Sequence, residues 1–162
     1  CPTFSPLENV LMVQKGKSSE FSMEEIRTTM CRLLPEECLN RPVSTLSGGM
    51  KRRTAILRAL LTKSDMLLLD EPFGALDVIT RNDMQDWLLQ LRKNYNRTTL
   101  LVTHDIDEAL YLSDRILILS NKPSHILQEI DLSKEKKSRD WLFSQSDLKK
   151  QVYELLKGEN HA

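Results

Sequence analysis

The sequence has few cysteines, no excess charge of either sign and no long apolar run, and each absence excludes a class of protein. Its 162 residues include three cysteines, Cys1, Cys31 and Cys38. An odd number at irregular spacing provides neither a disulfide framework nor a metal site, so we expect a reduced setting. Lys plus Arg and Asp plus Glu both number 23, a balance that does not point to nucleic acid. No apolar run approaches the roughly 20 residues that a transmembrane helix needs.

One stretch, residues 46–77, contains the residue types that phosphate handling requires. It opens with Leu-Ser-Gly-Gly-Met at residues 46–50 and continues as an apolar helical pattern. Ser47 can cap that helix, while Gly48 and Gly49 let a ligand approach its first backbone amides. Because the first amides of a helix attract anions, phosphate above all, we predict a phosphate-binding helix start at Ser47, Gly48 and Gly49.

The same stretch then changes to a short apolar run that ends in two carboxylates. Residues 66–69 are too few for a helix and fit a strand buried on both faces. Asp70 and Glu71 follow at its carboxyl end, where open α/β sheets bind their ligands. Because adjacent strand residues point in opposite directions, Asp70 can hold a hydrated Mg²⁺ while Glu71 faces an attacking water. Phosphoryl transfer requires this division of labour.

Four motifs in this order resemble those of the ATP-binding subunits of ABC transporters. Residues 46–50 resemble the family signature, usually Leu-Ser-Gly-Gly-Gln, and residues 66–71 resemble the Walker B strand with its catalytic Glu. Residues 75–77, Ala-Leu-Asp, resemble the D-loop, and His104 in Val-Thr-His-Asp resembles the switch histidine. Met50 in place of the usual Gln is similar to importers of the nitrate, sulfonate, taurine and pyrimidine-precursor group.

The resemblance implies an α/β fold, namely part of a P-loop NTPase-type ABC ATPase domain with a largely parallel sheet and a helical subdomain. It implies that residues 6–62 form the helical subdomain and signature helix, 63–132 the Walker B half of the sheet, and 133–162 a C-terminal helical tail. The implied function is ATP binding and hydrolysis that drive solute transport, by an importer, at the cytoplasmic face of the membrane. The implied partners are a second ABC ATPase subunit and transmembrane permease subunits, with no nucleic acid.

The resemblance also implies how the helix start and the D-loop act. Ser47, Gly48 and Gly49 would bind the γ-phosphate of an ATP molecule held by the second subunit. Asp77 would reach that second subunit through the D-loop. Capping of the following helix is the simpler account of Asp77, and the two roles are compatible.

The remaining implied roles are chemical. Asp70 would hold Mg²⁺ through water, and Glu71 would act as general base or orient the attacking water. His104 would sense the γ-phosphate by donating a hydrogen bond to it. A lone His at a strand end is more often structural, and only the neighbouring motifs favour the functional interpretation of His104.

The P-loop that such subunits need, Gly-x-x-x-x-Gly-Lys-Ser/Thr, is absent from the sequence. Gly16-Lys17-Ser18 imitates its end, but Leu11 stands where the first Gly is required and no strand precedes it. We therefore interpret 16–18 as a polar turn. Since the chain also begins with Cys1, we expect a fragment that alone neither hydrolyses ATP nor holds it tightly. Its sheet should leave an apolar face open, which favours self-association.

Two other classes of protein share parts of this pattern. The head of a chromosome-maintenance or recombination-repair ATPase also carries the signature and Walker B without a P-loop, but a long heptad helix should precede it, and residues 1–45 contain none. A non-catalytic regulatory relative would keep the fold and lose nucleotide binding. The basic residues 51–53 either form a solvated face or steer the nucleotide, and the pattern does not separate these alternatives.

Helices and strands alternate along the chain. Ser22 precedes Met-Glu-Glu, a capping-box pattern, and an apolar face follows at Met23, Ile26 and Met30. An apolar stripe in the last helix, residues 148–156, is interpreted as a packing face. The expected helices cover residues 6–14, 23–34, 47–61, 77–95, a segment from 105 onward, 140–143 and 146–156. The expected strands cover residues 66–69, 99–103, 114–119 and 124–132.

Overall fold

The computed structural model of the chain divides into two compact units, Cys1–Leu100 and Leu101–Ala162. The structure describes residues 1–14, 21–62, 64–74, 76–95 and 98–159. The predicted turn at Gly16–Ser18 and the Ala75 position of the D-loop resemblance lie outside these residues.

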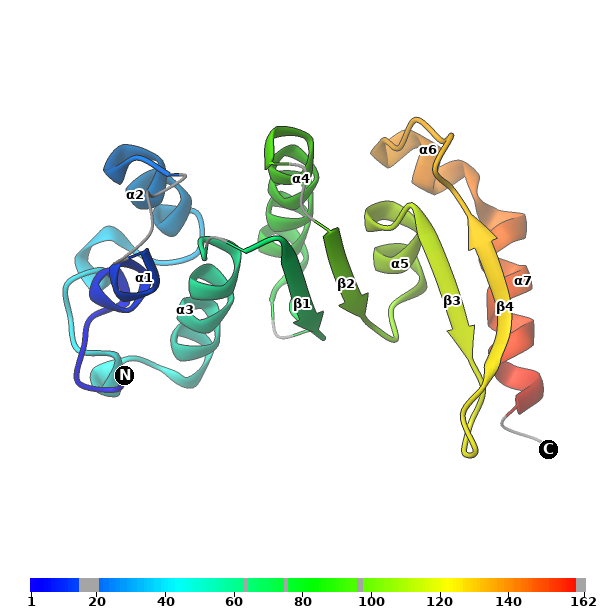
Figure 1. Ribbon diagram of the computed structural model, residues 1–162, viewed down its shortest axis with the longest axis horizontal. Helices are drawn as coiled ribbons and strands as arrows, with labels where there is room; N and C mark the ends of the chain where they lie inside the picture. Colours follow the sequence, from blue (N-terminus) through cyan, green and yellow to red (C-terminus); the bar gives the residue numbers. More distant parts are fainter. Residues whose placement is uncertain (15–20, 63, 75, 96–97, 160–162) are drawn as a thin grey trace. The chain divides into compact units, whose positions relative to one another are not determined.

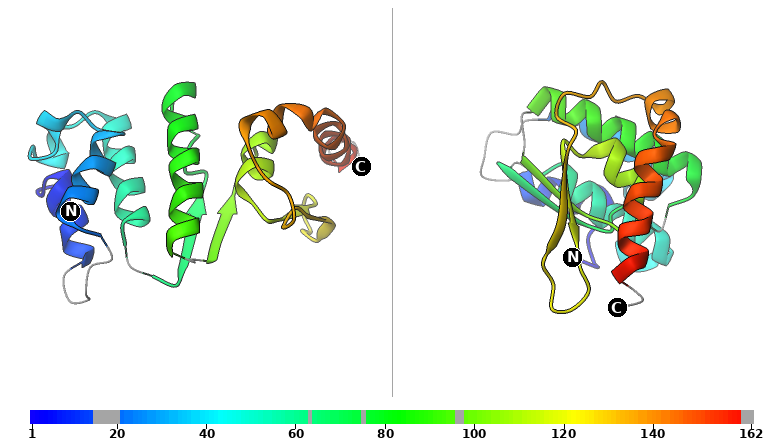
Figure 2. Two further views of the ribbon diagram at one scale, coloured as in Figure 1. Left: turned by 90° about the horizontal axis from the view of Figure 1, so that it is seen from above. Right: turned by 90° about the vertical axis from the view of Figure 1, so that its right-hand side faces the viewer.

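The helices of the first unit begin close to where the sequence pattern predicts. They are α1 (Pro6–Gln14), α2 (Met23–Cys31), α3 (Gly48–Leu60) and α4 (Val78–Tyr95), with the 3₁₀ turns η1 (Glu36–Cys38) and η2 (Val43–Thr45) between α2 and α3. In Figures 1 and 2, α1, α2 and α3 gather at one end of this unit, and α4 is a single long helix beside the strand that follows α3. Pro6 opens α1 because its fixed φ suits the first position of a helix.

The capping box predicted for α2 is confirmed. The Ser22 hydroxyl accepts a hydrogen bond from the Glu25 amide at 3.2 Å, and the Glu25 carboxylate accepts one from the Ser22 amide at 2.7 Å. Ile26 and Met30 are buried as predicted, but Met23 is 49% exposed. Its predicted burial is wrong because it is the first residue of the helix and lies at the edge of the buried face.

The core of the first unit joins helices to the turns between them. Phe73 is fully buried although it lies in the turn before α4, and Leu39 is fully buried after η1. The remaining fully buried large side chains of this unit come mainly from helices and helix ends: Val10, Ile26, Met30, Leu34, Leu57, Leu60, Leu61, Met84 and Leu88. The turn that precedes α4 is therefore anchored in the core by Phe73.

β1 (Met66–Asp70) pairs with β2 (Thr98–Val102), which begins in the first unit and ends at the second residue of the next one, and the two strands run parallel in Figure 1. The predicted burial of β1 on both faces is wrong. Leu67 and Leu69 are 4% and 5% exposed, whereas Met66 and Leu68 are 55% and 64% exposed. Because successive side chains of a strand point to opposite faces, one face of this sheet packs and the other stays open. The same alternation makes β2 half exposed instead of buried.

The second unit holds the other strand pair and three helices: α5 (Ile106–Leu112), β3 (Arg115–Leu119), β4 (Ile126–Asp131), α6 (Arg139–Ser144) and α7 (Ser146–Glu159). β3 and β4 are antiparallel, with Arg115 opposite Asp131. α6 and α7 both pack on α5. Lys149 Nζ lies 2.8 Å from Asp107 Oδ1, and Val152 of the predicted α7 stripe is 5% exposed. The stripe is thus a packing face, as predicted.

No helix within the described ranges is both long and apolar enough to cross a membrane.

Candidate functional site

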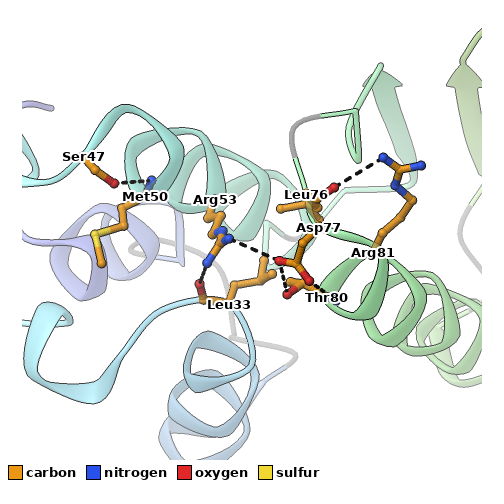
Figure 3. A network of polar contacts seen from close by, with 8 residues as sticks. All are labelled: Leu33, Ser47, Met50, Arg53, Leu76, Asp77, Thr80 and Arg81. Carbon is orange, nitrogen blue, oxygen red and sulfur yellow. Dashed lines mark hydrogen bonds and ion pairs between the residues drawn. The ribbon is translucent and has the colours of Figure 1, made fainter.

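The start of α3 is capped by the Ser47 side chain, and its first two residues, Gly48 and Gly49, are exposed. The Ser47 hydroxyl accepts a hydrogen bond from the Met50 amide at 3.3 Å (Figure 3), which confirms the predicted cap. Among the described residues, no heavy atom other than those of their chain neighbours and of the backbone of α3 lies within 4 Å of the position that a β-carbon would take on either glycine. The first turn contains no acidic side chain. The helix start thus has no side chain on its first two residues and no acid in its first turn that would oppose an anion at the first backbone amides.

The two adjacent carboxylates differ in their backbone more than the sequence predicts. Asp70 is the last residue of β1 and is exposed. Glu71 lies outside the strand with a φ of 46°, a left-handed conformation that residues other than glycine rarely adopt. Its Oε2 atom lies 3.7 Å from where a β-carbon on Gly74 would be. The prediction that these carboxylates separate by simple alternation along a strand therefore does not apply, because β1 ends at Asp70 and Glu71 already belongs to the turn.

Asp77 caps α4, as the sequence predicts. Its Oδ1 atom accepts from the Thr80 amide at 3.0 Å and its Oδ2 atom accepts from the Thr80 hydroxyl at 2.7 Å. These hydrogen bonds, and to a smaller extent the nearby Arg53 charge, hold the pKa of the Asp77 carboxyl below its ordinary value. The role of Asp77 toward a second subunit stays a prediction.

Two arginines of α3 contact segments that precede and follow this helix, and the sequence does not reveal these contacts. Arg52 Nη2 donates to the Glu71 carbonyl at 3.1 Å. Arg53 Nη1 donates to the Leu33 carbonyl at 3.2 Å, and its Nη2 lies 3.7 Å from Asp77 Oδ2 (Figure 3). Neither interpretation of residues 51–53 predicts these contacts, and the choice between a solvated face and nucleotide steering stays a prediction. No sequence pattern marks them, because two of the acceptors are backbone carbonyls, which every residue possesses.

His104 belongs to the second unit. It is exposed and lies between the end of β2 and Asp105, which caps α5 by accepting from the Glu108 amide at 3.0 Å. The Asp105 amide in turn donates to the Thr103 hydroxyl at 3.1 Å. The predicted location of His104 at a strand end, before a capped helix, is confirmed, and its function stays a prediction.

The donor set at the end of β1 suits magnesium held largely by water. Among the described residues no group of three or more His, Cys, Asp or Glu side chains could hold a metal ion. Asp70 offers one exposed carboxylate. Mg²⁺ keeps several of its waters and binds through one or two carboxylates together with substrate phosphates. The residues present therefore fit a Mg²⁺ shared with a nucleotide, and they do not form a protein cage for a metal.

The sequence profile of the family described as ABC transporter matches residues 2–74. The formylaminopyrimidine import ATP-binding protein ThiZ of Halalkalibacterium halodurans is 47% identical over 116 residues, which are 68% of this chain and 47% of the relative. The nitrate transport protein NasD of Klebsiella oxytoca is 42% identical over 118 residues, which are 73% of this chain and 44% of the relative. The chain therefore spans about half the length of the curated relatives it matches.

A solved structure shows the same fold. MJ0796, described as a bacterial ABC transporter cassette, is known as a dimer and in a post-hydrolysis state bound to ADP and Pi. In both structures it is 32% identical to this chain with a TM-score of 0.65, covering 82% of this chain and 58% of MJ0796. The predicted α/β fold of the ABC ATPase type is thereby confirmed. The chain belongs to the ABC transporter family and resembles the ATP-binding subunits of nitrate-type importers.

Proposed function

We propose that this chain carries the signature, Walker B, D-loop and switch-histidine part of an ATP-binding subunit of an ABC importer. The complete protein would bind and hydrolyse ATP at the cytoplasmic face of a membrane and drive solute import through transmembrane permease subunits. ThiZ and NasD, whose names describe import and transport, support the class of process. The helical subdomain, Walker B half and tail would be residues 6–62, 63–132 and 133–162.

The observation that carries the proposal is the backbone of Glu71. A φ of 46° on a residue with a side chain costs on the order of 1–3 kcal/mol and persists only where the surroundings impose it. Such conformations cluster at catalytic and ligand-binding sites. Here the conformation falls on the residue that directly follows Asp70, at the strand end where a parallel sheet binds its ligands.

The turn after β1 lets the two carboxylates perform different tasks. Asp70 would hold Mg²⁺ through water, and the ion would neutralise charge on the phosphates of ATP. Glu71 would accept the proton of the attacking water or orient that water. Because the Glu71 carboxylate lies near Gly74, it has left the line of the strand and need not compete with Asp70 for the same ligand.

The helix start, the D-loop and the histidine would complete a site between two subunits. Ser47, Gly48 and Gly49 would bind the γ-phosphate of an ATP held by the P-loop of the second subunit, which Asp77 would contact. The open surroundings of both glycines support this role. His104 would sense the γ-phosphate. Inactivity of this chain by itself remains a prediction.

The test replaces Glu71 with Gln in the full-length protein. Glu71→Gln keeps the shape and removes the base, so ATP hydrolysis should fall by about 10²–10⁴-fold while ATP binding is retained. The control is Glu37→Gln in the exposed turn η1, which removes one carboxylate elsewhere in the same unit and should leave turnover unchanged. A Glu71→Gln protein with normal turnover would contradict the assignment, and a parent that does not hydrolyse ATP would contradict the proposed function.

A further inference from the structure

We propose that Arg52 and Arg53 are positioning residues that fasten the turn 71–77 to helix α3. They would thereby hold Glu71, the residue proposed to activate water, in the backbone conformation that the turn gives it. The inference rests on the proposed function and assigns a purpose to two of the three basic residues at 51–53. Neither arginine is placed at the reacting atoms, so each would act through the residue that it holds.

Arg52 contacts Glu71, the first residue of the turn. Its Nη2 atom donates to the Glu71 carbonyl at 3.1 Å, across 19 residues of sequence. The direction of that carbonyl depends on the left-handed backbone of Glu71, since a residue with a more common φ would point its carbonyl elsewhere. A hydrogen bond from a charged donor is stronger than one from a neutral donor. Arg52 therefore favours the unusual conformation that separates the Glu71 side chain from Asp70.

Arg53 contacts Asp77, the last residue of the turn, and also Leu33, which follows α2. It donates to the Leu33 carbonyl at 3.2 Å and lies 3.7 Å from the Asp77 carboxylate (Figure 3). Its side chain is 29% exposed, so water screens these contacts less than it would at an open surface. Its Nε atom is buried without a hydrogen-bond partner among the described residues. The Leu33 carbonyl and the Asp77 carboxylate thus determine the position of the Arg53 side chain, although its guanidinium is not fully hydrogen-bonded.

Together the two arginines reach both ends of one turn. Consecutive residues of a helix project about 100° apart, so neighbouring arginines can reach different points. Arg52 reaches Glu71 and Arg53 reaches Asp77, while Phe73 anchors the middle of the turn in the core with 0% exposure. The turn and α3 should therefore move as one body, and loss of either arginine should displace Glu71 without removing it.

The experiment compares Arg52→Ala, Arg53→Ala and Arg52→Lys in the full-length protein. Lys51→Ala is the matched control, because Lys51 is an exposed cation on the same helical turn. For each arginine-to-alanine variant, kcat for Mg²⁺-ATP should fall about tenfold, as expected for the loss of one charge-assisted hydrogen bond, while KM and the affinity for ATP stay unchanged. Arg52→Lys, which keeps a charged donor, should recover part of kcat.

Hydrogen exchange provides a readout that does not depend on turnover. Backbone amides of residues 71–77 should exchange faster in Arg52→Ala and Arg53→Ala, while amides in the centre of α4 stay as protected as in the parent. Unchanged kcat and unchanged exchange in Arg52→Ala, in a parent that hydrolyses ATP, would overturn the inference and leave the proposed function intact. A parent without ATPase activity would overturn the proposed function, and the exchange experiment would still test the fastening. If Arg53→Ala does not fold, both kcat and hydrogen exchange can still be measured on Arg52→Ala, because Arg52 is exposed.

Discussion

Two of the helices of the first unit, α2 and α3, are capped by the same residue type, serine, but differ in the hydrogen bonds that surround the cap. In α2 the Ser22 hydroxyl accepts from the Glu25 amide, and the Glu25 carboxylate accepts from the Ser22 amide and hydroxyl. In α3 the Ser47 hydroxyl accepts from Met50, whose side chain cannot return a hydrogen bond to Ser47. The start of α2 is therefore closed by reciprocal hydrogen bonds between its own side chains and backbone. The start of α3 has the Ser47 cap without the reciprocal bond.

The difference shows that a cap can stabilise a helix with or without occupying the space in front of it. α2 has two acids in its first turn, Glu24 and Glu25, which satisfy the positive end of the helix dipole. α3 has none, and its first two residues are glycines with nothing within 4 Å of a β-carbon. The start of α3 thus keeps the attraction for an anion that α2 has already used internally, and three experiments test that contrast.

The largest effect is expected when a charge is placed at the first position of each helix. Gly48→Asp in the full-length protein should weaken ATP-driven association of two subunits about tenfold, because a carboxylate would occupy the place of a phosphate. Met23→Asp, at the same position of α2, is the control and should leave association unchanged. Since open space surrounds Gly48, the variant should fold. Equal association of Gly48→Asp and the parent by light scattering with ATP would contradict the phosphate role of α3.

Removal of the two caps should have a smaller effect that separates stability from function. Ser22→Ala and Ser47→Ala should each lower the free energy of unfolding by about 1 kcal/mol, the usual contribution of such a cap. Urea unfolding followed by circular dichroism measures this. Only Ser47→Ala should also weaken ATP-driven association. If Ser22→Ala weakens association equally, the contrast between the two helix starts is wrong.

The smallest effect is expected from acid. Hydrogen bonds from the Ser22 amide and hydroxyl hold the pKa of Glu25 below its ordinary value. A depressed pKa means that the contribution of Glu25 is fully present above the unfolded-state pKa and is lost as the pH falls from there through the lower folded-state pKa. The Ser22 amide resonance should therefore shift in that range, and Glu25→Gln should remove the shift. A parent whose Ser22 amide does not respond to acid would contradict the capping box as a source of stability.

Local features of the chain were predictable because they depend on neighbours in sequence. The α1 helix occupies Pro6–Gln14 as expected, and the caps at Ser22, Ser47 and Asp77 form as expected. Each of these needs only a side chain that reaches the backbone three residues away. Residues 66–71 were also recognisable, because a short apolar run before two acids is visible in sequence order.

Features that depend on distant segments were missed. The burial of Met66 and Leu68 was predicted wrongly, because burial of a strand face depends on what covers the sheet and not on the strand itself. The left-handed backbone of Glu71 was not foreseen, since nothing in its residue type favours that conformation.

The sequence by itself determined where helices start, which side chains cap them, and in what order the candidate phosphate and water ligands occur. Only the tertiary structure decided that α3 leaves its first turn open and that Arg52 and Arg53 hold the turn between Glu71 and Asp77. The physical reason is the range of the interactions. A cap joins residues three apart in sequence. The hydrogen bond from the Arg52 guanidinium to the Glu71 carbonyl spans 19 residues, so it forms only when the fold brings α3 and the turn together.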